Sequence, residues 1–105
     1  NSTVEDNILI LKSFLYKLKR LEKLKKEIEI KKDTDQVISS YKPLIFWKDK
    51  DIIKKQLNIL SRKDIKSFIK KINKLELLVK KNANLSSEIT NNFIFETINQ
   101  PNNSI

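Results

Sequence analysis

The first part of the chain carries apolar side chains at the spacing of an α-helix. They recur at steps of four, three, four and three residues, at Val4, Ile8, Leu11, Leu15 and Leu18. Such steps bring the side chains onto one helix face. We therefore expect a helix over about residues 3–32, with Thr3 and Asp6 forming a variant of the capping box at its start. Further apolar residues widen this face and predict contacts with more than one neighbour: Ile10, Phe14, Leu21, Leu24 and Ile28.

A short second helix and an apolar connector are expected next. Residues 33–35 read Asp-Thr-Asp, which offers a helix stop followed by a new cap. A helix over residues 36–41 would then bury Val37, Ile38 and Tyr41. Pro43 ends this helix, because the residue before a proline is pushed towards an extended conformation. The apolar run over residues 44–47 is predicted to be an extended, buried connector.

A third helix is expected from residue 48 or 49 to residue 59 or 60. Its side chains at helical spacing are expected to be buried: Ile52, Ile53, Gln56 or Leu57, and Leu60. Ser61, with Asp64 three residues later, predicts the start of a fourth helix that runs to about Lys81. The buried positions of that helix are predicted to be Ile65, Phe68, Ile69, Ile72, Leu75 and Val79.

A fifth helix is expected from residue 86 or 87 to Asn99. Residues 82–84 form the turn before it, at a place where glycine would be usual. The helix is expected to present four apolar side chains: Ile89, Phe93, Ile94 and Ile98. Pro101 and the polar residues after it predict a frayed tail.

Five helices with short connections predict a single all-α, bundle-like domain over residues 1–100, with a disordered tail over residues 101–105. The chain has no glycine and only two prolines, which argues against hairpin-rich β architectures. The centre of the core is expected to consist of Ile8, Leu11, Leu15, Leu18, Ile53, Leu57, Ile65, Ile69, Ile72, Val79 and Phe93.

The chain offers little chemistry to an active site. It contains no histidine, cysteine or glycine, so it has no imidazole base, no thiolate metal ligand and no glycine-rich phosphate loop. Its 13 carboxylates lie mostly among lysines, which is typical of a charged helix surface. Glu76 and Lys80, four residues apart, are expected to form such a surface pair. We expect no catalytic residues, no cofactor and no metal.

The net charge of +9 keeps a nucleic-acid-binding function open as an alternative. Residues 17–32 carry eight basic and three acidic side chains, and residues 48–81 carry twelve basic and four acidic ones. In the first of these segments glutamates interrupt the lysines, and aromatic residues suited to base stacking are not interleaved with them. The pattern therefore favours a weak, non-specific attraction to nucleic acid. An AT-rich genome would also enrich lysine, isoleucine and asparagine.

Phe46 and Trp47 are the most unusual feature of the chain, since two large aromatic residues stand side by side after a proline. Neighbouring side chains of an extended segment point to opposite sides. The pair is therefore either buried between two layers of the core or divided between the core and a partner protein. If Trp47 is a core residue, its truncation to alanine should cost about 3 to 5 kcal/mol of stability.

The segment around this pair resembles the opening of the last domain of the bacterial DNA polymerase III delta subunit, a clamp-loader family. In that family a basic residue and one or two prolines precede an aliphatic residue, two aromatics and a basic cluster. Residues 42–50 read Lys-Pro-Leu-Ile-Phe-Trp-Lys-Asp-Lys, and Gln56, Leu57 and Ser61 follow in the family's order. Leu44 stands where a second proline is usual, and Leu60 where an aromatic often precedes the cap.

Two other segments are similar to the same family. Residues 9–24 resemble its first collar helix, and in the fourth helix an acidic residue precedes a lysine by four. The matching residues are Phe14, Leu15, Leu18, Arg20, Leu75, Glu76 and Lys80. The resemblance thus covers most of the chain and implies an all-α domain of the clamp-loader collar type.

The resemblance implies a role in assembly rather than catalysis. The delta subunit opens the ring-shaped sliding clamp within a pentameric, ATP-driven loader at primed DNA. Its last domain joins those of neighbouring subunits in a helical collar. The chain would then contact other clamp-loader subunits directly, and would meet the sliding clamp and primed DNA only through the full-length complex. It would belong to the DNA polymerase III holoenzyme without catalysing a reaction itself.

The expected interface comprises Pro43, Phe46, Trp47, Lys48 and Lys50, together with the exposed side of the first helix. The upstream domains of such a subunit are absent from this chain, and Asn1 in place of methionine indicates an excised fragment or a processed chain. The first residues lack the pattern of a secretory signal. We expect a bacterial, cytoplasmic protein with no membrane contact.

Overall fold

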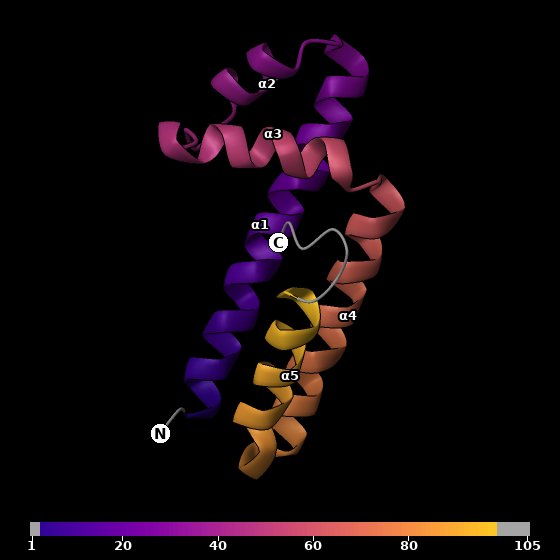
Figure 1. The fold of residues 1–105 in the computed structure, drawn as a ribbon. Coiled ribbons are helices and arrows are strands. Elements are labelled where there is room, and N and C mark those ends of the chain that lie inside the picture. The colour runs from indigo at the N-terminus through magenta and orange to yellow at the C-terminus, as the bar shows by residue number, and fades with distance from the viewer. Residues whose placement is uncertain (1–2, 99–105) are drawn as a thin grey trace.

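The computed structural model describes residues 3–98, and within that range the chain forms five α-helices and two short 3-10 turns (Figure 1). The α-helices are α1 (Val4–Lys31), α2 (Thr34–Ser40), α3 (Lys50–Ile59), α4 (Arg62–Lys81) and α5 (Ser86–Ile98). The 3-10 turns are η1 (Trp47–Asp49) and η2 (Ala83–Leu85). The predicted all-α class and the five helices are confirmed. The predicted tail and the end of the fifth helix at Asn99 lie outside the described residues.

The helix α1 is the axis of the molecule and contacts each of the other four helices. Its 28 residues span about 42 Å at 1.5 Å per residue, nearly the 46 Å length of the longest axis. Figure 1 shows α4 running antiparallel to α1, with α5 beside both at the end where the chain begins. At the other end α3 crosses α1, and α2 lies above α3 at the top of the view. The helices thus form two groups that share α1.

The predicted capping boxes are present at both long helices. In α1 the backbone N–H of Asp6 donates to Thr3 Oγ1 at 3.0 Å, and the N–H of Thr3 donates to Asp6 Oδ2 at 3.2 Å. In α4 the N–H of Asp64 donates to Ser61 Oγ at 3.0 Å, and the N–H of Ser61 donates to Asp64 Oδ2 at 2.9 Å. Each box satisfies two backbone donors that a helix start leaves without partners.

Removal of the Ser61 hydroxyl should shorten or loosen the start of α4. We expect Ser61→Ala to lower the free energy of unfolding by about 1 kcal/mol, because a helix donor loses its acceptor. Denaturant unfolding followed by circular dichroism measures this change. Ser67→Ala, on an exposed position of the same helix, is the matched control and should change stability by less than about 0.5 kcal/mol. Equal effects of both substitutions would contradict the capping role.

The same box predicts a pH dependence. The pKa of Asp64 is lowered from 3.8, chiefly because its carboxylate accepts the backbone N–H of Ser61. A carboxyl group with a lowered folded-state pKa stabilises the fold above its unfolded pKa, and the contribution is lost as the pH falls through the folded value. The difference in melting temperature between the wild type and Asp64→Ala should therefore be constant above about pH 5 and shrink below about pH 4. A difference that stays unchanged down to about pH 2 would contradict this assignment.

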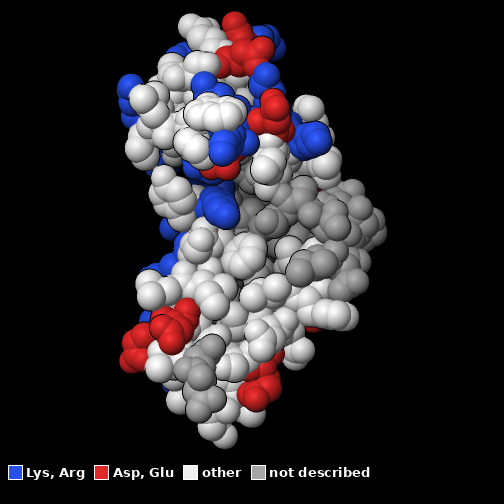
Figure 2. All heavy atoms as spheres, turned by 60° about the vertical axis from the view of Figure 1, so that its left-hand side comes forward, with Lys and Arg blue, Asp and Glu red and all other residues white. Residues whose placement is uncertain are grey.

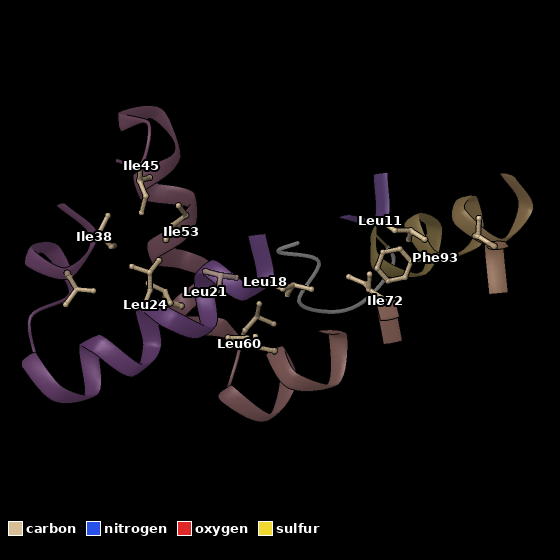
Figure 3. Close-up of a cluster of buried hydrophobic side chains, with 14 residues drawn as sticks. Leu11, Leu18, Leu21, Leu24, Ile38, Ile45, Ile53, Leu60, Ile72 and Phe93 are labelled. Atoms are coloured by element: carbon tan, nitrogen blue, oxygen red, sulfur yellow. The ribbon is translucent and has the colours of Figure 1, made fainter. Parts of the chain in front are cut away.

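The core follows α1 through both groups of helices. In Figure 3, Leu18, Leu21 and Leu24 of α1 lie near Ile38, Ile45, Ile53 and Leu60, while Leu11 lies near Ile72 and Phe93. The ring of Phe14 meets Phe93 edge to face, with 5.4 Å between the ring centres. Eight of the expected core residues are buried: Leu11, Leu18, Ile53, Leu57, Ile65, Ile72, Val79 and Phe93. The other three are partly buried against them: Ile8, Leu15 and Ile69.

The prediction of a buried connector over residues 44–47 was wrong. Ile45 is buried, but Leu44 and Phe46 are 68% and 56% exposed and Trp47 is 69% exposed. Alternation along an extended segment explains this result, because Ile45 enters the core and its two neighbours therefore point outward. Trp47 already belongs to the turn η1. The interpretation of Phe46 and Trp47 as core aromatics is thus overturned.

Ile52 is a second correction, since it was expected to be buried and is 56% exposed. The helix α3 buries a single narrow face through Ile53, Leu57 and Leu60. Ile52 precedes this face by one residue, which is about 100° around the helix. Ile10 of α1 lies at the exposed edge of its helix for the same reason. Among the described residues, Tyr41, Phe68, Leu75, Ile89 and Ile94 are partly buried against the core, as the broad apolar pattern predicts.

Candidate protein-interaction surface

An aromatic pair projects from the chain just before α3. The ring centres of Phe46 and Trp47 lie 5.9 Å apart, and the ring planes are inclined by 55°. Both rings are more than half exposed, and the side chain of Leu44 beside them is exposed as well. Aromatic rings bury more apolar area than other side chains, so their exposure to water is unfavourable unless a partner covers them.

The pair is held on a fixed turn. The side chain of Ile45, directly before Phe46, is buried in the core. The backbone N–H of Asp49 donates to the carbonyl oxygen of Phe46 at 2.9 Å and closes η1. The turn passes into α3 without a break. Because the backbone is anchored on both sides, little conformational entropy would be lost when a partner binds the two rings.

Positive charge surrounds the pair. The Nζ atom of Lys48 lies 5.4 Å from the centre of the Trp47 ring, in the arrangement of a cation–π contact. Lys42 is exposed and Lys50 is half-buried. Figure 2 shows most of the Lys and Arg side chains of this face towards the end of the molecule that carries α2 and α3, with acidic side chains among them, whereas the charged side chains of the lower part are mainly acidic. The apolar surface therefore has a basic rim.

The five predicted interface residues lie close together, in the segment that leads into α3 and at the first residue of that helix. Pro43, Phe46, Trp47 and Lys48 are exposed. Lys50 is half-buried at the start of α3. We call the exposed residues Leu44, Phe46, Trp47, Lys48 and Ile52 the aromatic surface. Analysis of the sequence missed Leu44 and Ile52, since their apolar character fitted burial equally well.

A groove lies next to the aromatic surface, between α1 and α3. It has a volume of about 230 Å³ and is lined by Lys17 and Arg20 of α1 and by Asp49, Ile52, Ile53 and Gln56. The Nε atom of Arg20 is buried and has no hydrogen-bond partner within residues 3–98, although its guanidinium lies 5.8 Å from the ring of Tyr16.

A second apolar surface lies on the outer side of α1. Leu9, Tyr16 and Ile30 are exposed there, and they are separated by seven and fourteen residues. These separations place the three side chains on one face of the helix. The exposed side of α1, which is predicted to belong to the interface, therefore carries these three apolar side chains. We call these residues the α1 surface.

The ion pairs of the domain lie at its surface. Glu76 contacts Lys80 at 3.3 Å, as predicted, and it also contacts Lys12 of α1 at 3.7 Å. Arg62 of α4 contacts Glu29 near the end of α1 at 3.1 Å. Lys54 of α3 is paired with Asp35 of α2, and this hydrogen bond raises the pKa of Lys54 above 10.5. These exposed pairs orient the helices but contribute little stability.

The described part of the chain contains no cluster of side chains suited to a metal site. No three acidic side chains lie close enough together there to hold a metal ion. No helix among residues 3–98 is long and apolar enough to cross a membrane.

No protein family, no curated protein and no solved structure matches this chain.

Proposed function

We propose that this chain is an assembly domain of the clamp-loader collar type, belonging to the delta subunit of DNA polymerase III. The observation that carries the proposal is the exposed pair Phe46 and Trp47 on a fixed turn. The pair lies in the segment over residues 42–50, which carries the resemblance to that family. A domain in a ring of subunits needs apolar surface beyond its own core, and this pair supplies it.

The composition of the aromatic surface supports a protein partner. Tryptophan and arginine are enriched among the residues that dominate binding energy, and such residues cluster in pockets that exclude water. Ile52, in the first turn of α3, lines the groove that contains Arg20 and follows Trp47 by five residues in the chain. The partner surface would place an apolar side chain against Trp47.

The presence of two surfaces supports a place between two neighbours. The aromatic surface is on the connector and α3, whereas the α1 surface is on the outer side of a different helix. A subunit within a ring contacts one neighbour on each side through two different surfaces. In this role the domain joins subunits and carries out no chemical step. The loader that it helps to assemble would place the sliding clamp on primed DNA.

Co-purification tests the proposal. The chain, carrying an affinity tag, is mixed with the other clamp-loader subunits of the same organism and recovered at low and high salt. Because apolar contacts are weakened little by salt, we expect the subunits to be recovered with the chain under both conditions. Failure to recover any loader subunit at either salt concentration would overturn the proposal.

A further inference from the structure

The outward side of α4 carries a row of five lysines. Lys63, Lys66, Lys70, Lys74 and Lys81 follow one another at steps of three, four, four and seven residues. These steps place all five on one helix face. All five are exposed, and Figure 1 shows α4 at the edge of the molecule, with α1 and α5 on its inner sides. We call these residues the lysine row.

The lysine row has no acidic neighbours on its own helix face. Of the two carboxylates in α4, Asp64 forms the capping box with Ser61 and, among the lysines of the row, interacts electrostatically only with Lys63 at its start. Glu76 contacts Lys12 and Lys80 instead. Lys71, also in α4, contacts Glu96 of α5 at 2.8 Å. By contrast, no member of the row has a carboxylate within ion-pair distance in the described part of the chain.

Such a row is unfavourable in the isolated chain. Like charges at spacings of three and four residues on a helix repel each other. The repulsion would be relieved by a ligand that carries a regular line of negative charges. The row extends over about 27 Å, since its ends are 18 residues apart at a rise of 1.5 Å each.

We propose that the lysine row binds the phosphate backbone of double-stranded nucleic acid. The row contains no aromatic side chain on which the bases of a single strand could stack. Lysine is depleted in protein interfaces, and the exposed large apolar residues of α4 are Leu77 and Leu78, which are too few for a membrane surface. Lysines on a straight helix neutralise phosphates without reading the bases, so binding would not depend on sequence.

The inference does not depend on the proposed assembly function. It uses a different helix and residues outside the aromatic surface. On α1 the exposed Lys19, Lys23 and Lys26 also share one helix face, but that row has three members, whereas the row on α4 has five. The net charge does not distinguish the lysines of α1 from those of α4, whereas the arrangement on α4 predicts one defined line of phosphate contacts.

Salt-dependent binding to a labelled DNA duplex of about 20 base pairs tests the proposal, with fluorescence anisotropy as the readout. Neutralisation of five phosphates predicts that the affinity falls about 500-fold between about 50 and 200 mM monovalent salt. In the variant Lys66→Gln/Lys70→Gln/Lys74→Gln, two phosphate contacts remain, so the affinity should fall only about 10-fold over the same range of salt concentration. The affinity of this variant at low salt should also be clearly lower than that of the wild type.

The matched control is Lys19→Gln/Lys23→Gln/Lys26→Gln. It lowers the net charge from +9 by the same three units, but its exposed lysines lie outside the row. We expect it to retain the salt dependence of the wild type. Equal losses of DNA affinity in both variants would overturn the proposal and would indicate an attraction that depends on net charge alone. Tighter binding to polyglutamate or to the single strand than to the duplex would overturn it in favour of an acidic protein or a single-stranded ligand.

Discussion

Leu18→Ala is expected to lower the free energy of unfolding by about 3 to 4 kcal/mol. Leu18 is fully buried in the middle of α1, and Figure 3 shows it between the group around Ile53 and the group around Ile72. Its truncation removes apolar contacts and leaves a cavity at the junction of the two groups, which cannot collapse without moving α1. Since small domains are stable by only about 5 to 15 kcal/mol, the effect should be large in a denaturant titration.

Leu9→Ala is the matched control for this substitution. Leu9 lies on the same helix but is 65% exposed, so its truncation should change stability by less than about 0.5 kcal/mol. The two variants differ only in which side of α1 loses the side chain. Comparable losses of stability in the two variants would show that α1 does not pack against the other helices through the face that contains Leu18.

Phe46→Ala/Trp47→Ala is expected to weaken assembly with the neighbouring loader subunit by about 2 to 4 kcal/mol, or roughly 30- to 1000-fold. The two rings supply most of the apolar area of the aromatic surface and are already fixed by the turn that carries them. The free energy of unfolding should change by less than about 1 kcal/mol, because neither ring belongs to the core. Titration calorimetry and thermal unfolding separate the two effects.

Leu78→Ala/Leu85→Ala controls for the loss of exposed apolar area in general. These two side chains are also exposed, but they lie at the end of α4 and in η2, away from α3 (Figure 1). We expect this variant to assemble as the wild type does. If truncation of the aromatic pair unfolded the chain and left assembly unchanged, the pair would be structural and the proposed interface would be wrong.

The helices and their starts could be predicted because their signals are local. The capping boxes at Thr3 and Ser61 depend on residues three positions apart, and the apolar period of α1 and α4 is long enough to identify the buried face. Burial of single residues near the ends of elements could not be predicted in the same way. Ile52 and Leu44 have the character of core residues, and only the packing of α3 across α1 decides that they face water.

Some polar contacts of the core were also beyond prediction from the sequence. Asn7 is buried, and its side-chain amide donates to the carbonyl oxygen of Thr3 at 2.8 Å. The same amide lies 3.4 Å from the hydroxyl oxygens of Ser86 and Ser87 at the start of α5. This contact joins residues about 80 positions apart, and no local pattern indicates it. Both interpretations of the aromatic pair placed at least one ring in the core, whereas both rings are exposed, because Ile45 is the residue of this segment that enters the core.

Trp47 is the single tryptophan of the chain, so its fluorescence reports directly on the aromatic surface. Incorporation of a tryptophan analogue that absorbs at longer wavelength separates its signal from any tryptophan in the partners. In the free chain we expect the emission of a water-exposed indole that acrylamide quenches readily. Addition of the other loader subunits should shift the emission to shorter wavelength and protect the ring from acrylamide, because the partner removes it from water. Unchanged emission and quenching in an assembled complex would contradict the claim that Phe46 and Trp47 form the interface.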